Sequence, residues 1–316
     1  MRLRLDWRGT HTEARTFCPE LPANAEGKIG CGASSNRRAG DCCASVGWNF
    51  GYNHALLTEA PRDRIEVVLV SPRNPLNIGA AARAMANFSF SRLSVVAPYE
   101  PHWREAKSAV GAEELLQNAR RAASLKEAVA DCTLVIGTGT LAHRRPEQPV
   151  VALPSLGPRI EQELERGGRV ALVFGPEKHG LTREDLAQCH LLVEIPTDPR
   201  QPSMNLGQAV AVCLYELAAQ RNASAGQRAG GKEKSAARIT PADPDESAAA
   251  PVSMRDLDLL AEVIAETMQA ADYSPTAMQK ANRHDLDLLL RRLALTHGDA
   301  RRILGLFRRI LWRLGR

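Results

Sequence analysis

The chain has 316 residues, of which 44% are hydrophobic, and its formal net charge is +5. This length suits about two domains. No apolar run approaches the roughly 20 residues that a membrane-spanning helix needs, so we expect no membrane-embedded part. The small net charge by itself selects no partner.

The first residues, MRLRLDWRGTHTEARTF, are basic but lack the apolar region of a secretory signal. We therefore expect a cytoplasmic protein. Because the cytoplasm is reducing, its seven cysteines are expected to be free thiols.

Residues 1–62 are expected to form a disordered N-terminal extension. They hold Cys18, Cys31, Cys42 and Cys43 without any helical or strand period. Their apolar content cannot build a core. The adjacent pair Cys42-Cys43 does not have the spacing of a zinc-binding pair. A small metal or redox module is the alternative, and translation from an upstream start codon would explain such an extension.

Residues 63–221 alternate between apolar runs and helical patterns, which predicts an α/β domain with a mostly parallel sheet. Buried strands are expected at 65–70, 93–97, 132–136, 170–174 and 191–195. Helices are expected at 76–88, 109–123, 124–130 and 204–212, and a further helix is expected to begin after Thr182, with Asp185 completing its cap.

The rest of the chain is expected to be a linker and a small helical extension. Residues 222–250 are rich in Ala, Gly, Ser and charge, as linkers are. Residues 251–316 carry three amphipathic helical stripes, with Asp299 as the expected N-cap of the third. Residues 279–316 hold ten Lys and Arg against three Asp, which favours a polyanionic partner. A solvated helix surface or a dimer clamp fits the same pattern.

Three loops after predicted strands have the composition of ligand-binding loops. They are 137–140 (GTGT), 175–181 (GPEKHGL) and 196–203 (PTDPRQPS). The carboxyl ends of parallel strands share one edge of a sheet, where ligands bind. None has the GxGxxG spacing of a dinucleotide site. Arg83, in the first predicted helix, is either a surface residue or a guanidinium that reaches across the site to a phosphate.

Three segments in this order resemble the motifs of a known family. They are Asn77-Ile78-Gly79 through Arg83, the 175–181 loop, and 195–206. Together they resemble the SPOUT superfamily, in particular the TrmH-type RNA ribose 2′-O-methyltransferases. The resemblance covers 63–221 and extends loosely over 251–316, which looks like the helical extension of the TrmJ-type branch.

The resemblance implies a fold, a cofactor and partners. The fold is the SPOUT α/β fold with a C-terminal trefoil knot, a feature otherwise nearly absent from proteins. The methyl donor is S-adenosyl-L-methionine, and the substrate is nucleotide 32, cytidine or uridine, in the tRNA anticodon stem-loop. The family forms homodimers with the active site at the interface. The cofactor-binding residues it implies are Thr138, Gly139, Thr140, Gly175, Ile195, Pro202, Ser203 and Met204.

The resemblance also implies catalytic roles, without a metal. Arg83 matches the family's catalytic arginine. Because arginine stays protonated, we expect it to grip an RNA phosphate that accepts or relays the 2′-hydroxyl proton. The residues expected to position Arg83 and the ribose are Asn77, Glu177, Ser203 and Asn205. Pro202 replaces a residue that is often small and polar, and Lys178 and His179 receive no role.

Two alternatives remain open. One is a 2′-O-methyltransferase acting on ribosomal RNA, and the other is a non-catalytic RNA-binding SPOUT protein. The C-terminal position of the helical extension favours tRNA. The presence of all the expected catalytic residues argues against loss of activity.

Overall fold

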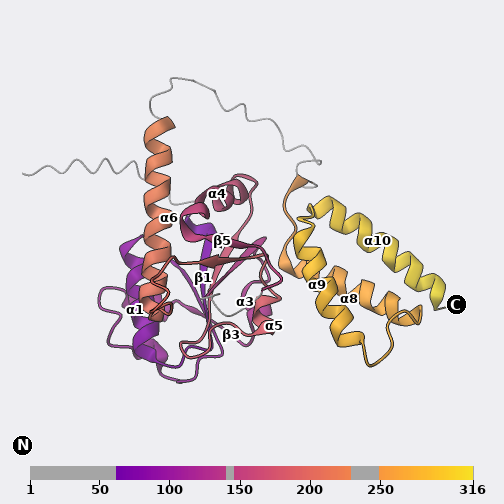
Figure 1. Cartoon of the computed structure of the whole chain (residues 1–316), viewed down its shortest axis with the longest axis horizontal. Coiled ribbons are helices and arrows are strands. Elements are labelled where there is room, and N and C mark those ends of the chain that lie inside the picture. The colour runs from indigo at the N-terminus through magenta and orange to yellow at the C-terminus, as the bar shows by residue number, and fades with distance from the viewer. Residues whose placement is uncertain (1–61, 140–145, 229–248, 316) are drawn as a thin grey trace, which may run out of the picture. The chain divides into compact units, whose positions relative to one another are not determined.

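The computed structural model describes residues 62–139, 146–228 and 249–315 (Figure 1). The predictions for residues 1–61, for Thr140, for the basic loop that follows it and for most of the predicted linker lie outside these ranges.

The described residues form a seven-stranded sheet in the order β3-β2-β1-β6-β4-β7-β5, with every neighbouring pair parallel. The expectation of a mostly parallel α/β fold is therefore confirmed. The knot stays a prediction. The strands are β1 Ile65–Val70, β2 Arg92–Val96, β3 Arg120–Ala122, β4 Leu134–Thr138, β5 Val150–Ala152, β6 Val170–Phe174 and β7 Leu191–Glu194.

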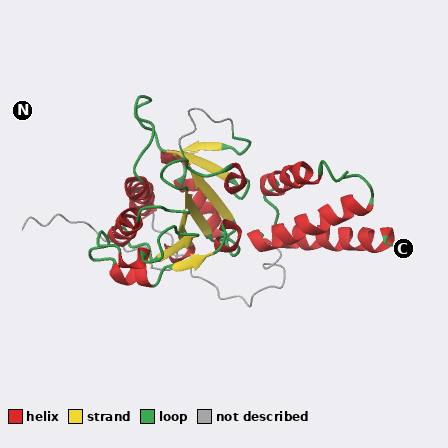
Figure 2. Cartoon of the chain, turned by 90° about the horizontal axis from the view of Figure 1, so that it is seen from below, coloured by secondary structure: helices red, strands yellow, loops and turns green. Residues whose placement is uncertain are grey.

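Successive residues of the central strands pack on opposite faces of the sheet, as their pleat requires. Val67 and Leu69 join one buried cluster, and Val68 and Val70 join the other. All residues of β1 and β6 are buried, because helices cover both faces (Figure 2).

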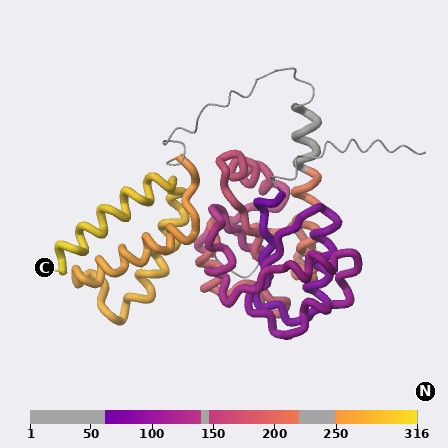
Figure 3. Tube along the Cα trace, turned by 180° about the vertical axis from the view of Figure 1, so that it is seen from behind, coloured from indigo at the N-terminus to yellow at the C-terminus, as the bar shows by residue number. Residues whose placement is uncertain are grey.

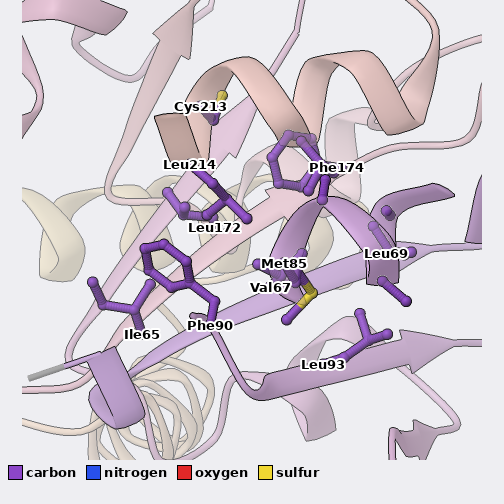
Figure 4. Packing of buried hydrophobic residues seen from close by; sticks show 14 of the residues in the cluster. Ile65, Val67, Leu69, Met85, Phe90, Leu93, Leu172, Phe174, Cys213 and Leu214 are labelled. Atoms are coloured by element: carbon purple, nitrogen blue, oxygen red, sulfur yellow. The ribbon is translucent and has the colours of Figure 1, made fainter. Parts of the chain in front are cut away.

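Helices α1 (Pro75–Asn87), α4 (Gly157–Glu165) and α6 (Leu206–Arg228) cover the first face. Figure 4 shows Met85 of α1 and Leu214 of α6 among the strand side chains of this cluster. Helices α1 and α6 approach closely at Gly207, where a Cβ would lie 2.7 Å from the Cβ of Ala80. This contact fixes the start of α6 against the start of α1.

The second cluster includes side chains of α3 (Leu125–Ala128), α8 (Met254–Ala270), α9 (Gln279–Arg292) and α10 (His297–Leu314). Figure 3 traces the last three of these helices in orange and yellow. Backbone hydrogen bonds tie the start of α8 to the segment before β4, since Met254 N donates to Cys132 O over 2.9 Å. Of the helices in the described ranges, none combines the length and apolarity needed to cross a membrane.

Two local predictions in the sheet region need correction. The helix expected at 109–123 is wrong: only α2 (Glu113–Gln117) is helical, and β3 follows it. Gly111 has a φ of 75°, which interrupts the helix, and β3 gains backbone pairing with the edge of β2. Strand β5 and helix α4 were not predicted. β5 is short and is the outer strand beside β7.

Helix boundaries give one confirmation and two differences. Thr182 and Asp185 form the expected capping box before α5 (Arg183–Leu186). The N-cap of α10 is Thr296, not Asp299, because the Thr296 hydroxyl accepts a hydrogen bond from Asp299 N. Helix α6 continues to Arg228, so residues 222–228 of the predicted linker are helical.

Ser89 is predicted to be a site of backbone strain that a glycine would relieve. It follows α1 with a φ of 59°, and its N–H bonds Ala86 O while Phe90 N–H bonds Met85 O, a Schellman arrangement. Because the left-handed region favours glycine, Ser89→Gly should raise the free energy of unfolding by about 1 kcal/mol. Urea denaturation would measure this. Ala86→Gly, in the same helix, is the control and should lower stability by about 1 kcal/mol. Equal losses in both variants would contradict the prediction.

Candidate functional site

A cavity of about 340 Å³ lies at the carboxyl ends of β4, β6 and β7. All the described residues that were predicted to bind cofactor line it, namely Thr138, Gly139, Gly175, Ile195, Pro202, Ser203 and Met204. The predicted Thr140 lies outside the described residues. The cavity brings together the three loops that follow these strands.

The strand order explains why the three loops meet. β4 lies between β6 and β7, so the three carboxyl ends are neighbours. Thr138, at the end of β4, donates its hydroxyl hydrogen to Val173 O in β6 over 3.0 Å. Gly139 N donates to Val193 O in β7 over 3.4 Å. The loop after β4 is thereby tied to both neighbours.

The loop after β6 folds back tightly upon Gly175. A Cβ on this residue would lie 2.3 Å from Leu181 N and 2.4 Å from the carbonyl carbon of Gly180. Gly180 itself has a φ of 64°, and its N–H bonds Pro176 O over 2.9 Å. Only glycine permits this approach of backbone to backbone. The fold of the loop places the Glu177 side chain toward the start of α1.

The carboxylate of Glu177 accepts three hydrogen bonds from the loop before α1 and from its first turn. Oε2 accepts from Arg73 N at 3.1 Å. Oε1 accepts from Asn74 N at 3.2 Å and from Asn77 Nδ2 at 2.8 Å. The residues joined are about one hundred positions apart in sequence, so this carboxylate is a tertiary link between motifs one and two.

The hydrogen bonds keep Glu177 ionised. Partial burial by itself raises the pKa of its carboxyl group, but the bonds from Asn77 and from the backbone N–H groups together outweigh that effect. The pKa of Glu177 therefore lies below its ordinary value of 4.5. A fixed negative charge stands in the cavity wall at neutral pH.

Asn205 extends the link to motif three. Its Nδ2 donates to Asn77 Oδ1 over 3.0 Å, while its Oδ1 accepts from Gly207 N at 2.9 Å and so caps the start of α6. One continuous chain of hydrogen bonds thus runs from Glu177 through Asn77 to Asn205. Of the five predicted catalytic residues, the structure connects these three directly.

The other two predicted catalytic residues are placed differently. Ser203 lines the cavity. Arg83 is exposed on α1 and does not line the cavity, and it has no ion-pair partner within the described part of the chain. A single chain therefore does not bring Arg83 to the cavity wall.

The cavity has an apolar side that the sequence analysis did not anticipate. Its lining includes four leucines, Leu181, Leu186, Leu192 and Leu206. Lys178 and His179 line it as well. The leucines are ordinary core residues of their elements in sequence, so no pattern set them apart. Apolar walls with a few placed polar groups are typical of small-molecule sites.

The lining combines apolar side chains, loop backbone, an acidic side chain and basic side chains. The leucines supply apolar contact, the loop backbones supply donors and acceptors, and Glu177 supplies negative charge. Among the residues that the structure describes, no group of three His, Cys, Asp or Glu side chains could hold a metal ion.

Comparison with known proteins gives relatives of the domain that holds the cavity. The SpoU rRNA methylase family model matches residues 64–215. A tRNA (cytidine/uridine/adenosine-2′-O-)-methyltransferase TrmJ from Pseudomonas aeruginosa is 44% identical over 161 residues, which are 49% of this chain and 60% of that protein. The chain thus spans about 60% of the length of this curated relative.

Solved structures similar to this chain include a TrmJ protein. The crystal structure of TrmJ from Z. mobilis ZM4 has a TM-score of 0.62 and 28% identity, and the match covers 78% of this chain and 98% of that one. A putative methylase family protein from Neisseria gonorrhoeae is 34% identical, with a TM-score of 0.46, over 51% of this chain and 84% of that one. On the family model and the identity to TrmJ, residues 64–215 form a SpoU methylase domain.

Proposed function

We propose that the chain is an S-adenosyl-L-methionine-dependent RNA methyltransferase that acts on tRNA, methylating the ribose 2′-hydroxyl of nucleotide 32, cytidine or uridine, in the anticodon loop. The observation that carries the proposal is the meeting of the loops after β4, β6 and β7 at one cavity inside a SpoU-family domain. The tRNA substrate follows the names of the relatives. Position 32 follows the resemblance of the motifs and of the helical extension.

The residues of the cavity fit the proposed methyl donor. Its adenine would lie against the leucines and the backbone of the loop after β7, and its cationic end would be favoured by the Glu177 carboxylate. Gly175 is required because any side chain there would meet the backbone of Gly180 and Leu181. When bound, this cofactor supplies an electrophilic methyl group on a sulfonium. The leaving group is a neutral thioether, so its departure needs no metal.

The chain's own task is to position the ribose and to assist the removal of its proton. A hydroxyl is a weak nucleophile at neutral pH, so its proton must leave as attack proceeds. Arg83 would hold an RNA phosphate that accepts or relays this proton, since a guanidinium is itself always protonated. Ser203, which lines the cavity, would orient the ribose, and Asn77 and Asn205 would act indirectly by holding Glu177 and the start of α6 in place.

We infer further that the active unit is a homodimer in which Arg83 serves the cavity of the partner subunit. The support is that Arg83 is exposed and lies away from the cavity of its own chain. Helices α1 and α6 also leave large apolar side chains exposed: Leu76 is 53% exposed and Tyr215 is 59% exposed. A second copy would cover such residues.

The described cysteines are free and buried, which suits a cytoplasmic enzyme.

Ribosomal RNA is the second candidate substrate, because the matching family model is described as an rRNA methylase family. A non-catalytic RNA-binding role is the third candidate. The same experiment separates all three.

The test is methyl transfer in vitro. Purified protein and S-adenosyl-L-methionine are incubated with unmodified tRNA and, separately, with unmodified ribosomal RNA, and 2′-O-methylation is mapped at each nucleotide. A new methyl group at tRNA nucleotide 32 is expected. Methylation of ribosomal RNA alone would identify ribosomal RNA, and not tRNA, as the substrate. Cofactor binding without any methylation would favour the non-catalytic role.

Arg83→Ala is expected to lower the rate of methyl transfer by about 100-fold or more, because it removes the group that aids proton removal. The affinity for S-adenosyl-L-methionine should stay within about twofold, because the proposed partner of Arg83 is an RNA phosphate and not the cofactor. Single-turnover methylation and calorimetric cofactor titration measure the two quantities. Arg92→Ala, which removes another exposed arginine, is the control. Turnover like that of the wild type would remove Arg83 from the mechanism.

Glu177→Gln is expected to weaken both the fold and cofactor binding. The amide NH₂ of glutamine would face N–H donors, so we expect a loss of about 1–2 kcal/mol in stability and about tenfold in cofactor affinity. Because the pKa of Glu177 is lowered, its contribution is complete above 4.5 and is lost as pH falls through the folded-state pKa. The stability gap between wild type and variant should therefore close in acid. Urea denaturation across pH measures it, with Glu100→Gln as the exposed control. A gap that stays constant down to acid pH would contradict this assignment.

A further inference from the structure

The loop between β7 and α6 contains a turn whose shape does not depend on side-chain charge. Gln201 N donates to Asp198 O over 2.8 Å, which closes a four-residue β-turn with proline at its second position. Asp198 Oδ1 also accepts from Arg200 N at 2.9 Å, as in an Asx turn. At the base of the loop, Thr197 Oγ1 donates to Pro202 O over 3.3 Å. Backbone bonds, prolines and the side-chain oxygens of Asp198 and Thr197 therefore hold the turn, without the Arg200 guanidinium.

The same turn holds an arginine at the edge of the cavity. Thr197 and Pro202, on either side of the turn, both line the cavity. Arg200 Nη2 lies 2.7 Å and Nε 3.1 Å from the two oxygens of Asp198, a bidentate ion pair. The Arg200 side chain is nevertheless 89% exposed. Exposed ion pairs of this kind contribute little to stability, so this one is free to exchange partners.

We propose that Arg200 is an RNA-phosphate-binding residue that Asp198 holds in readiness at the mouth of the cofactor cavity. On RNA binding, the guanidinium would exchange the Asp198 carboxylate for a phosphate near the target nucleotide. The two anions present the same bidentate geometry to arginine, which makes the exchange sterically simple. The turn itself would keep its shape, because its backbone bonds do not involve the guanidinium.

The inference rests on the proposed function, since it requires RNA as the substrate. It adds a residue with a defined electrostatic consequence. Asp198 competes with RNA for the guanidinium of Arg200. Removing the negative charge of Asp198 should therefore strengthen RNA binding, and only while Arg200 is present.

The experiment is a double-mutant cycle on binding of an unmodified tRNA transcript, measured by fluorescence at several salt concentrations with cofactor present. Asp198→Asn keeps the acceptor of the Asx turn and loses the charge, so it should tighten binding about threefold. Arg200→Gln should weaken binding and lower the slope of log affinity against log salt by about one unit, the loss of one phosphate contact. The double variant should bind like Arg200→Gln.

A matched control carries the same charge change far from the cavity. Asp131 pairs with Arg255 Nη2, also over 2.7 Å. Asp131 lies just before the amino end of β4, whereas the cavity lies at the carboxyl end of that strand. Asp131→Asn should leave tRNA affinity within about twofold of the wild type, because the charge is screened over that distance.

Four results would overturn the inference. Tightening by Asp198→Asn that persists without Arg200 would be a general charge effect. A parallel loss of cofactor affinity in Arg200→Gln, measured by calorimetry, would mean that the pair only shapes the loop. Wild-type protein that binds no tRNA would remove the tRNA reading of the proposed function and this inference with it, whereas tRNA binding with a flat cycle would remove only the inference.

Discussion

The hydrogen bonds accepted by the Glu177 carboxylate are the constraint on which the site depends. They join a loop that follows β6 to the loop and first turn of α1, and Asn77 passes the link to Asn205 at the start of α6. Three segments that are distant in sequence are thereby fixed relative to one another. A carboxylate that accepts several N–H bonds is also held in its charged form, so the link and the negative charge of the cavity have one cause.

Glycines and prolines fix the backbone conformation of the rest of the site. Gly175 allows the loop after β6 to fold against Gly180 and Leu181, and prolines fix the loop after β7. The close approach of Gly207 to Ala80 sets α6 against α1. Catalytic side chains are correspondingly few. This division suits the proposed reaction, in which the protein must shape a cofactor cavity and orient a ribose, and the proposed cofactor carries the reactive methyl group.

The sequence was informative where apolar runs are continuous and where loops follow strands. β1, β6 and β7 were predictable because buried parallel strands are uninterrupted apolar runs, and the loops after β4, β6 and β7 had to meet because those strands are parallel. β3 reads Arg-Arg-Ala and carries no such signal, since its edge position is set by pairing with β2. The N-cap of α10 is Thr296 rather than Asp299; both are residue types that cap helices, and the hydrogen bond from Asp299 N to the Thr296 hydroxyl distinguishes them. No pattern in one chain indicates that Arg83 lies away from its own cavity.

The central claim is that the chain from Glu177 through Asn77 to Asn205 acts as one unit that shapes the cofactor cavity. A double-mutant cycle on S-adenosyl-L-methionine affinity tests it most directly, with Asn77→Ala and with Asn205→Ser, which keeps an N-cap acceptor for α6. The account predicts that the double variant loses little more affinity than either single variant, a coupling of about 1 kcal/mol. Losses that simply multiply would show that the two residues act independently and would contradict the account.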